Sequence, residues 1–158
     1  MIAVHVDTTG TKEFMNRLLK DDVLDTFEVR GVEMTIGTRI SIDGNLIIQK
    51  ENLDESPEKQ QGYTTWEALR PLVFAIIKTG AKPKQVKIIF SFKTENVKDI
   101  HPNAAALFLN MVYENDTVNF TTATAQKDFS LEKSLDDSWD EWVRSFFIMK
   151  NISVIDRE

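Results

Sequence analysis

The sequence predicts an α+β fold in which one antiparallel sheet carries about three helices, packed mainly on one of its faces. Segments in which apolar and polar residues alternate, the pattern of a half-buried strand, occur between stretches of helical periodicity. Short turns join neighbouring predicted strands, which favours antiparallel pairing, and a helix followed by a three-strand meander occurs twice. We therefore expect a sheet of about six or seven strands.

Length and composition limit the class of protein. The 158 residues are expected to form a single domain, 1-158, and a chain of this size buries roughly 70% of its unfolded surface. The absence of cysteine excludes disulfides, thiolate nucleophiles and cysteine-based metal sites. A net charge of -6 disfavours a general attraction to nucleic acid or to anionic membranes.

The hydropathy pattern predicts a soluble, cytoplasmic protein. The longest apolar run, Leu72 to Ile77, is far shorter than the roughly 20 residues that a membrane helix needs. Met1 to Asp7 lacks the basic and then apolar pattern of a signal peptide.

The first part of the chain predicts one strand and one helix. Apolar residues alternate from Ile2 to Val6, which indicates a short strand. Thr11 is expected to cap a helix that runs to about Lys20. The apolar face of this helix consists of Phe14, Met15, Leu18 and Leu19.

A meander of three antiparallel strands is predicted between Phe27 and Gln49. The parity of the apolar residues changes at Gly31, which indicates a β-bulge. Gly37-Thr38 is expected to form one turn and Asp43-Gly44 a tight hairpin turn. The strand that returns from the second turn would be Leu46 to Ile48.

The centre of the predicted core is a helix and a strand between Thr64 and Phe92, after a polar loop from Glu51 to Gly62. Thr64-Thr65-Trp66-Glu67 matches a capping box, with Thr64 at the N-cap, and Gly80 follows the expected end of the helix. Pro71 lies beyond the first turn, so we expect a kink or two helical pieces. Val86 to Phe92 alternates like a central strand.

The apolar segment Leu107 to Tyr113 fits either a helix or a strand. We predict a strand, because Glu114-Asn115-Asp116 is typical of a turn and Val118 to Ala125 is rich in Thr and Phe. A single helical turn is expected before it, at Asn103 to Ala106.

A third helix is predicted from Ser134, which begins a second capping box, to Lys150. A wide apolar stripe on this helix consists of Leu135, Trp139, Trp142, Val143, Phe146 and Phe147. Ile152 to Ile155 is expected to add a last edge strand.

Several segments resemble a family of short uncharacterised proteins from anaerobic Gram-positive bacteria. The segments are Phe27-Glu28-Val29-Arg30-Gly31-Val32-Glu33, Leu69-Arg70-Pro71, Tyr113-Glu114-Asn115 and Lys133-Ser134-Leu135-Asp136 through Trp139-Asp140-Glu141. The resemblance covers nearly the whole chain, and it implies a domain of unknown function with no assigned activity, cofactor or site. The repeated element order is also similar, at the level of fold alone, to one domain of a DNA sliding clamp. The last helix departs from that pattern.

No catalytic motif such as HExxH, GxSxG, GxGxxG or a P-loop occurs in the sequence. We therefore predict no cofactor and no metal site, and we expect that the protein is not an enzyme. The alternative is an enzyme with an unrecognised site around Asp136, Asp140 and His101. Acids at the start of a helix more commonly stabilise its dipole.

Five cationic residues form a candidate site for an anion or for nucleic acid. They are Lys12, Arg17, Lys82, Lys84 and Lys87, and three of them lie between Lys78 and Lys93, where the chain has no acidic residue. The alternative interpretation is a solubilising loop and a strand edge that lysines protect from pairing.

A candidate protein contact lies on the last helix, at Trp139, Trp142 and Arg144. Trp and Arg are enriched at the energetic centres of protein interfaces, although most Trp residues complete a core. We predict a homodimer whose interface includes part of Trp139 to Ile155. The favoured function is a non-catalytic binding or protein-interaction module, with a clamp-like nucleic-acid protein and an enzyme as alternatives.

Overall fold

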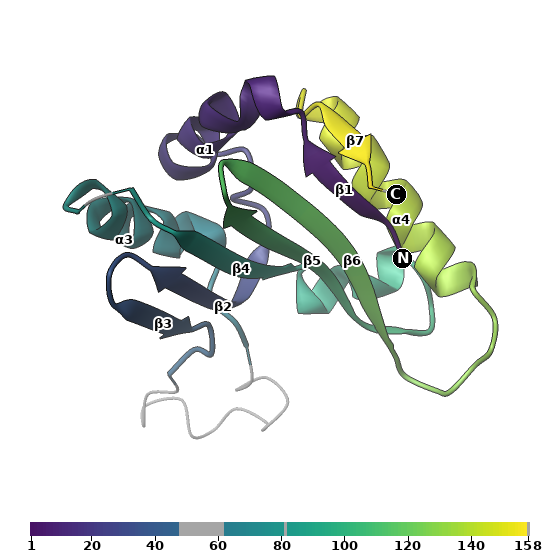
Figure 1. Cartoon of the computed structure of the whole chain (residues 1–158). Helices are drawn as coiled ribbons and strands as arrows, with labels where there is room; N and C mark the ends of the chain where they lie inside the picture. Colours follow the sequence, from purple (N-terminus) through teal and green to yellow (C-terminus); the bar gives the residue numbers. More distant parts are fainter. Residues whose placement is uncertain (48–61, 81, 158) are drawn as a thin grey trace.

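The computed structural model describes residues 1–47, 62–80 and 82–157. It confirms the α+β class, with one seven-stranded antiparallel sheet in the order β3-β2-β4-β5-β6-β1-β7 (Figure 1). The strands are β1 (Ala3–Val6), β2 (Glu28–Thr35), β3 (Arg39–Asp43), β4 (Gln85–Ser91), β5 (Ala104–Glu114), β6 (Thr117–Gln126) and β7 (Val154–Asp156). The helices are α1 (Thr11–Lys20), α3 (Trp66–Lys78) and α4 (Ser134–Met149), with short 3-10 helices η1 (Thr8–Gly10) and η3 (Thr94–Asp99).

Helices α1, α3 and α4 cover one face of the sheet, and no helix of the described residues lies on the other face (Figure 1). Alternation along β4 shows the two faces, because Val86, Ile88 and Phe90 are buried whereas Lys87 and Ile89 are exposed. Helix α1 reaches the covered face through Phe14 on Phe120, α3 through Trp66 on Phe90, and α4 through Phe147 on Phe120. Among the described residues, no helix is both long and apolar enough to cross a membrane.

Strands β4, β5 and β6 form the second predicted meander. The segment Leu107 to Tyr113 lies within β5, so the strand prediction is confirmed. Asn115 and Asp116 both adopt positive φ (53° and 59°) at the β5–β6 turn, which is the backbone that a two-residue type I′ hairpin requires. The helical turn predicted at Asn103 to Ala106 is wrong, because β5 begins at Ala104 and the helical turn lies earlier, in η3.

The region of β2 and β3 confirms the predicted bulge at Gly31 and one of the two predicted turns. The register of β2 against β4 shifts between Val29 and Gly31. The chain reverses through Gly37, whose φ is 116°, while the hairpin predicted at Asp43-Gly44 is wrong. Gly44 instead continues beside β2, where its N–H donates to Arg30 O at 3.0 Å.

The third strand of the first predicted meander is not formed by the residues that the structure describes. Asn45 makes an isolated bridge to Tyr63, and Leu46 and Ile47 belong to no strand. Ile48 and all but the last residue of the predicted loop from Glu51 to Gly62 lie outside the described ranges.

The N-caps of α1, α3 and α4 differ from the predicted ones. For α3 and α4, the predicted cap residues Thr64 and Ser134 form other hydrogen bonds. The N-cap of α3 is Thr65, which accepts from Ala68 N at 3.2 Å, while the N–H of Thr64 donates to Gly44 O at 2.8 Å. No described side chain caps α4, because Ser134 Oγ pairs with His101 Nε2. Helix α1 starts after Gly10 rather than being capped by Thr11.

Two further predictions concern helix continuity and the last strand. Helix α3 is one continuous helix that contains Pro71, rather than two pieces. The last strand, β7, pairs with β1 and forms one edge of the sheet. It starts at Val154, two residues after the predicted start at Ile152. Ile152 is buried and joins the core instead.

The close approach of Gly44 to β2 predicts a large cost for any side chain at this position. An added Cβ would lie 1.8 Å from Val29 O, a backbone atom. We expect Gly44→Ala to lower the free energy of unfolding by at least ~2 kcal/mol in urea denaturation. Gly31→Ala is the matched control, because the nearest described atom to its Cβ would be 3.6 Å away. Equal stability of the two variants would contradict the predicted clash.

Candidate functional site

The structure brings together only two of the five predicted cationic residues. Lys12 and Lys82 line one hollow of about 520 Å³, which we call the α1 hollow; its lining residues are Thr8, Thr11, Lys12, Met15, Asn16, Lys82, Tyr113 and Asp116. Lys87 lies beside Glu33 on the face of the sheet opposite the helices, and Lys84 is an exposed residue just before β4. The five residues therefore do not form one continuous basic patch.

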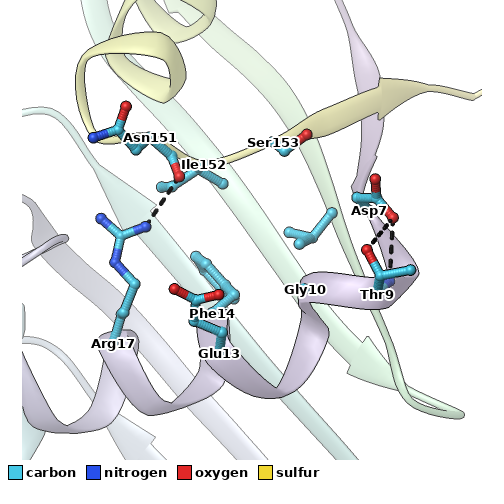
Figure 2. A pocket seen from close by; sticks show the side chains of 10 residues that line it. Asp7, Thr9, Gly10, Glu13, Phe14, Arg17, Asn151, Ile152 and Ser153 are labelled. Carbon is cyan, nitrogen blue, oxygen red and sulfur yellow. Dashed lines mark hydrogen bonds between the residues drawn. The ribbon is translucent and has the colours of Figure 1, made fainter.

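Arg17 links α1 to the C-terminal end of α4 through hydrogen bonds. Its guanidinium donates to Asn151 O at 3.1 Å (Figure 2). It also donates to Lys150 O, so it satisfies carbonyls at the C-terminus of α4. The adjoining hollow, between Asp7, Glu13 and Arg17, has a volume of about 130 Å³. That volume is below the range of roughly 300–1,000 Å³ that is typical of sites for small molecules.

One wall of the α1 hollow is a polar cluster of Lys82, Asp116 and Tyr113. Lys82 Nζ pairs with Asp116 Oδ1, and the same oxygen accepts the Tyr113 hydroxyl at 3.2 Å. The hydrogen bond and charge of Lys82 lower the pKa of Asp116, whose carboxylate in turn raises the pKa of Lys82. Burial raises the pKa of Tyr113, so its phenol keeps the proton at neutral pH. The sequence did not predict a site role for Tyr113 or Asp116.

The predicted contact on α4 is only partly at the surface. Trp139 is fully buried and donates from Nε1 to Phe108 O at 2.9 Å, so its side chain is not available to a partner. Trp142 is partly buried, with its ring stacked between Trp139 and Phe146 at centroid distances of 5.2 and 5.4 Å. Arg144 is exposed and pairs with Asp156 at 3.0 Å.

His101 and Ser134 form a contact that could be mistaken for a catalytic pair. The Nδ1 of His101 accepts the backbone N–H of Asn103 at 3.1 Å, so the neutral ring carries its proton on Nε2. That nitrogen lies 3.0 Å from Ser134 Oγ and therefore donates to it. A general base would have to accept the serine proton instead. The contact links the start of β5 to the start of α4.

The acidic residues of the enzyme alternative bond to the sheet. Asp140 accepts the hydroxyl of Thr122 at 2.6 Å, and Asp136 accepts the hydroxyl of Thr124. Within the described ranges, no three His, Asp or Glu side chains gather closely enough to hold a metal ion. The geometry therefore gives no support to a catalytic or metal-binding centre at Asp136, Asp140 and His101.

A surface that the sequence prediction missed is the segment 127–133 between β6 and α4, which we call the display loop. Phe129 and Leu131 are 87% and 86% exposed. The sequence signal was present, since two large apolar residues stand in a polar turn region, but their exposure depends on how the loop is anchored. Only the structure shows that anchoring.

The pair of Lys82 and Asp116 predicts a measurable change of acidity. Replacing Lys82 with Met removes the hydrogen bond and the charge that lower the pKa of Asp116, so this pKa should rise towards its ordinary value. In the wild type, the stabilisation from this carboxylate is present at neutral pH and is lost as the pH falls through its lowered pKa. Carboxyl ¹³C NMR titration measures the shift. Lys84→Met is the control, and an unchanged Asp116 pKa in Lys82→Met would contradict the assignment.

The comparisons with known proteins agree with the resemblance in its coarser form. A model described as a family of unknown function (DUF5721) matches residues 17–154. No curated protein matches the chain, and no solved structure does. The bacterial source of the family and the fold-level similarity to a sliding clamp stay predictions. Because the match covers most of the sequence, the chain belongs to DUF5721, a family of unknown function.

Proposed function

We propose that this protein is a non-catalytic module that binds another protein through the display loop. The observation that carries the proposal is the near-complete exposure of Phe129 and Leu131, at 87% and 86%. Large apolar side chains that a fold holds in water are typical of contact sites for other proteins.

The display loop is held in place by hydrogen bonds at its base. The side-chain amide of Asn103 bonds twice to the backbone of Asp128 in the loop. Its Nδ2 donates to Asp128 O at 2.9 Å, and its Oδ1 accepts Asp128 N at 3.0 Å. Gln126 does the same for Ser130, with distances of 3.1 and 3.0 Å. Because these bonds already hold the loop in the free protein, the loop loses little conformational entropy on binding, which favours affinity.

The arrangement of the loop also indicates the chemistry of the partner. Ser130 is partly buried, whereas its neighbours Phe129 and Leu131 are both exposed, so the loop presents two large apolar side chains to solvent. Lys127 lies beside Lys98, and desolvation together with this like charge lowers the pKa of Lys127. The partner that fits is a protein with an apolar pocket for the two side chains.

The same geometry gives less support to the two alternatives. A clamp-like nucleic-acid protein needs a continuous basic surface, whereas Lys82 pairs with Asp116 and Arg17 binds the end of α4. An enzyme needs a polar cleft with activated groups, but His101 donates to Ser134 instead of accepting from it.

The test compares the full chain with the double variant Phe129→Ser/Leu131→Ser. A partner captured from extract of the source cell is identified, purified and titrated into both proteins by calorimetry. We expect the variant to bind at least ~30-fold more weakly, because an interface anchor contributes about 2 kcal/mol or more. The double variant should keep its thermal stability, since both side chains are exposed in the free protein.

Ile47→Ser is the matched control, because Ile47 is also a large apolar residue, 92% exposed, but lies after β3, outside the display loop. It should bind the partner like the wild type. The proposal is wrong if the purified partner binds the double variant with unchanged affinity, or if no protein binds the wild type.

A second proposal is the homodimer through part of Trp139 to Ile155. The edge of β7 that faces away from β1 pairs with no described strand. Ile148 and Met149 at the end of α4 are 77% and 67% exposed, and Ile155 on β7 is 47% exposed. A two-fold axis at this edge would bury apolar surface and pair backbone groups at the same time.

Size-exclusion chromatography with light scattering tests the homodimer. We expect the wild type to elute as a dimer at micromolar concentration and Met149→Glu as a monomer, because a charge would be buried in the interface. Trp142→Ala is a poorer test, since loss of its stacked ring also weakens the core. A monomeric wild type would rule the dimer out.

A further inference from the structure

We propose that the α1 hollow binds a small organic anion, in which a carboxylate or phosphate group is attached to an apolar part. This site is independent of the display loop and involves different residues. Its lining comes from three separate segments: η1 and α1, the residue Lys82 before β4, and the β5–β6 turn. A volume of about 520 Å³ falls within the range for small-molecule sites.

The first argument is charge. Lys12 and Lys82 line the hollow with a single carboxylate, that of Asp116, which leaves it locally positive in a protein whose net charge is -6. Within the described part of the chain, Lys12 makes no ion pair. The two ammonium groups are hydrogen-bond donors, as an anionic oxygen requires.

The second argument is a buried hydroxyl that lacks a partner. Thr11 is 6% exposed, and its Oγ1 forms no hydrogen bond with any described residue. A buried hydroxyl in this state costs stability unless something else bonds to it. Thr11 lines the hollow, but its Oγ1 is closed to solvent in the free protein, so rotation of the side chain is needed before a ligand oxygen can supply the missing partner.

The start of α1 adds to the same effect. Thr11 is the first residue of this ten-residue helix, and no described side chain accepts a hydrogen bond at its N-cap, Gly10. The N-terminus of a helix carries a partial positive charge and free N–H groups, both of which favour an anion. Met15, one turn further along, provides an apolar wall beside the Tyr113 ring.

Asp116 limits the affinity of the hollow for an anion, because its carboxylate pairs with Lys82 in the free protein. Its position is fixed by the type I′ turn, where both Asn115 and Asp116 have positive φ. Asn adopts this backbone readily, so Asp116→Asn keeps the turn while it removes the competing charge. The proposal therefore predicts tighter anion binding in Asp116→Asn and weaker binding in Lys82→Met.

The experiment titrates full-length protein with benzoate, phenyl phosphate and the uncharged benzamide, followed by ¹H–¹⁵N NMR. We expect saturable shifts around Thr11 to Asn16 and Tyr113 to Thr117 with one of the two anions, which identifies the preferred group, and none with benzamide. Lys12→Met/Lys82→Met should weaken binding by at least ~10-fold, and Asp116→Asn should strengthen it. Lys84→Met is the matched control, since Lys84 does not line the hollow.

Thr11→Val provides a second readout that does not depend on the charged residues. Removing the unpartnered hydroxyl should raise the melting temperature of the free protein and weaken binding of the preferred anion. The proposal fails if neither anion causes saturable shifts, if benzamide binds as well as the preferred anion, or if Lys84→Met weakens binding as much as the double variant. A lower melting temperature of Thr11→Val, with anion binding unchanged, would contradict the role of this hydroxyl in the site.

Discussion

The fold depends on a continuous series of aromatic contacts that joins the helices to one face of the sheet. The series starts on α4, where Trp142 stacks on Phe146, and continues through Phe27 and Phe90 to Trp66 on α3, with centroid distances of 5.2 to 5.8 Å. The indole of Trp66 then donates to a carbonyl of α1, that of Leu18, at 3.0 Å. Each such aromatic pair adds about 0.5–1.5 kcal/mol beyond the burial of its area, so α4, α3 and α1 are held together by mutual packing.

This one-sided core determines where binding can occur. Because the aromatic series uses the covered face and most large side chains of α4, Trp139 is not available at the surface. The remaining features of interest lie at the ends of strands β5 and β6, where loops leave the sheet. The turn at one end contributes Asp116 to the α1 hollow, and the loop at the other end displays Phe129 and Leu131. A rigid two-strand unit thus supports two surfaces with opposite chemistry.

The sequence was informative wherever local chemistry decides the structure. The turn residues Glu114-Asn115-Asp116, followed by the Thr- and Phe-rich segment Val118 to Ala125, identified Leu107 to Tyr113 as one strand of a hairpin. Local chemistry misled where a distant group competes for the same residue. Gly44 resembles a hairpin residue but is required because β2 passes beside it, and Ser134 bonds to His101 instead of capping α4. The pairing of Lys82 with Asp116 bridges 34 positions, which periodicity alone does not reveal.

The position of β1 in the sheet has a consequence for synthesis of the protein. This strand lies between β6 and β7, and Ile2 bonds to Thr122 across 120 positions of the chain. A nascent chain therefore makes β1 early but has no partner for it until β6 leaves the ribosome. During that interval Val4 and Val6 stay in contact with water, and closure of the sheet adds a long-range step of the kind that slows folding.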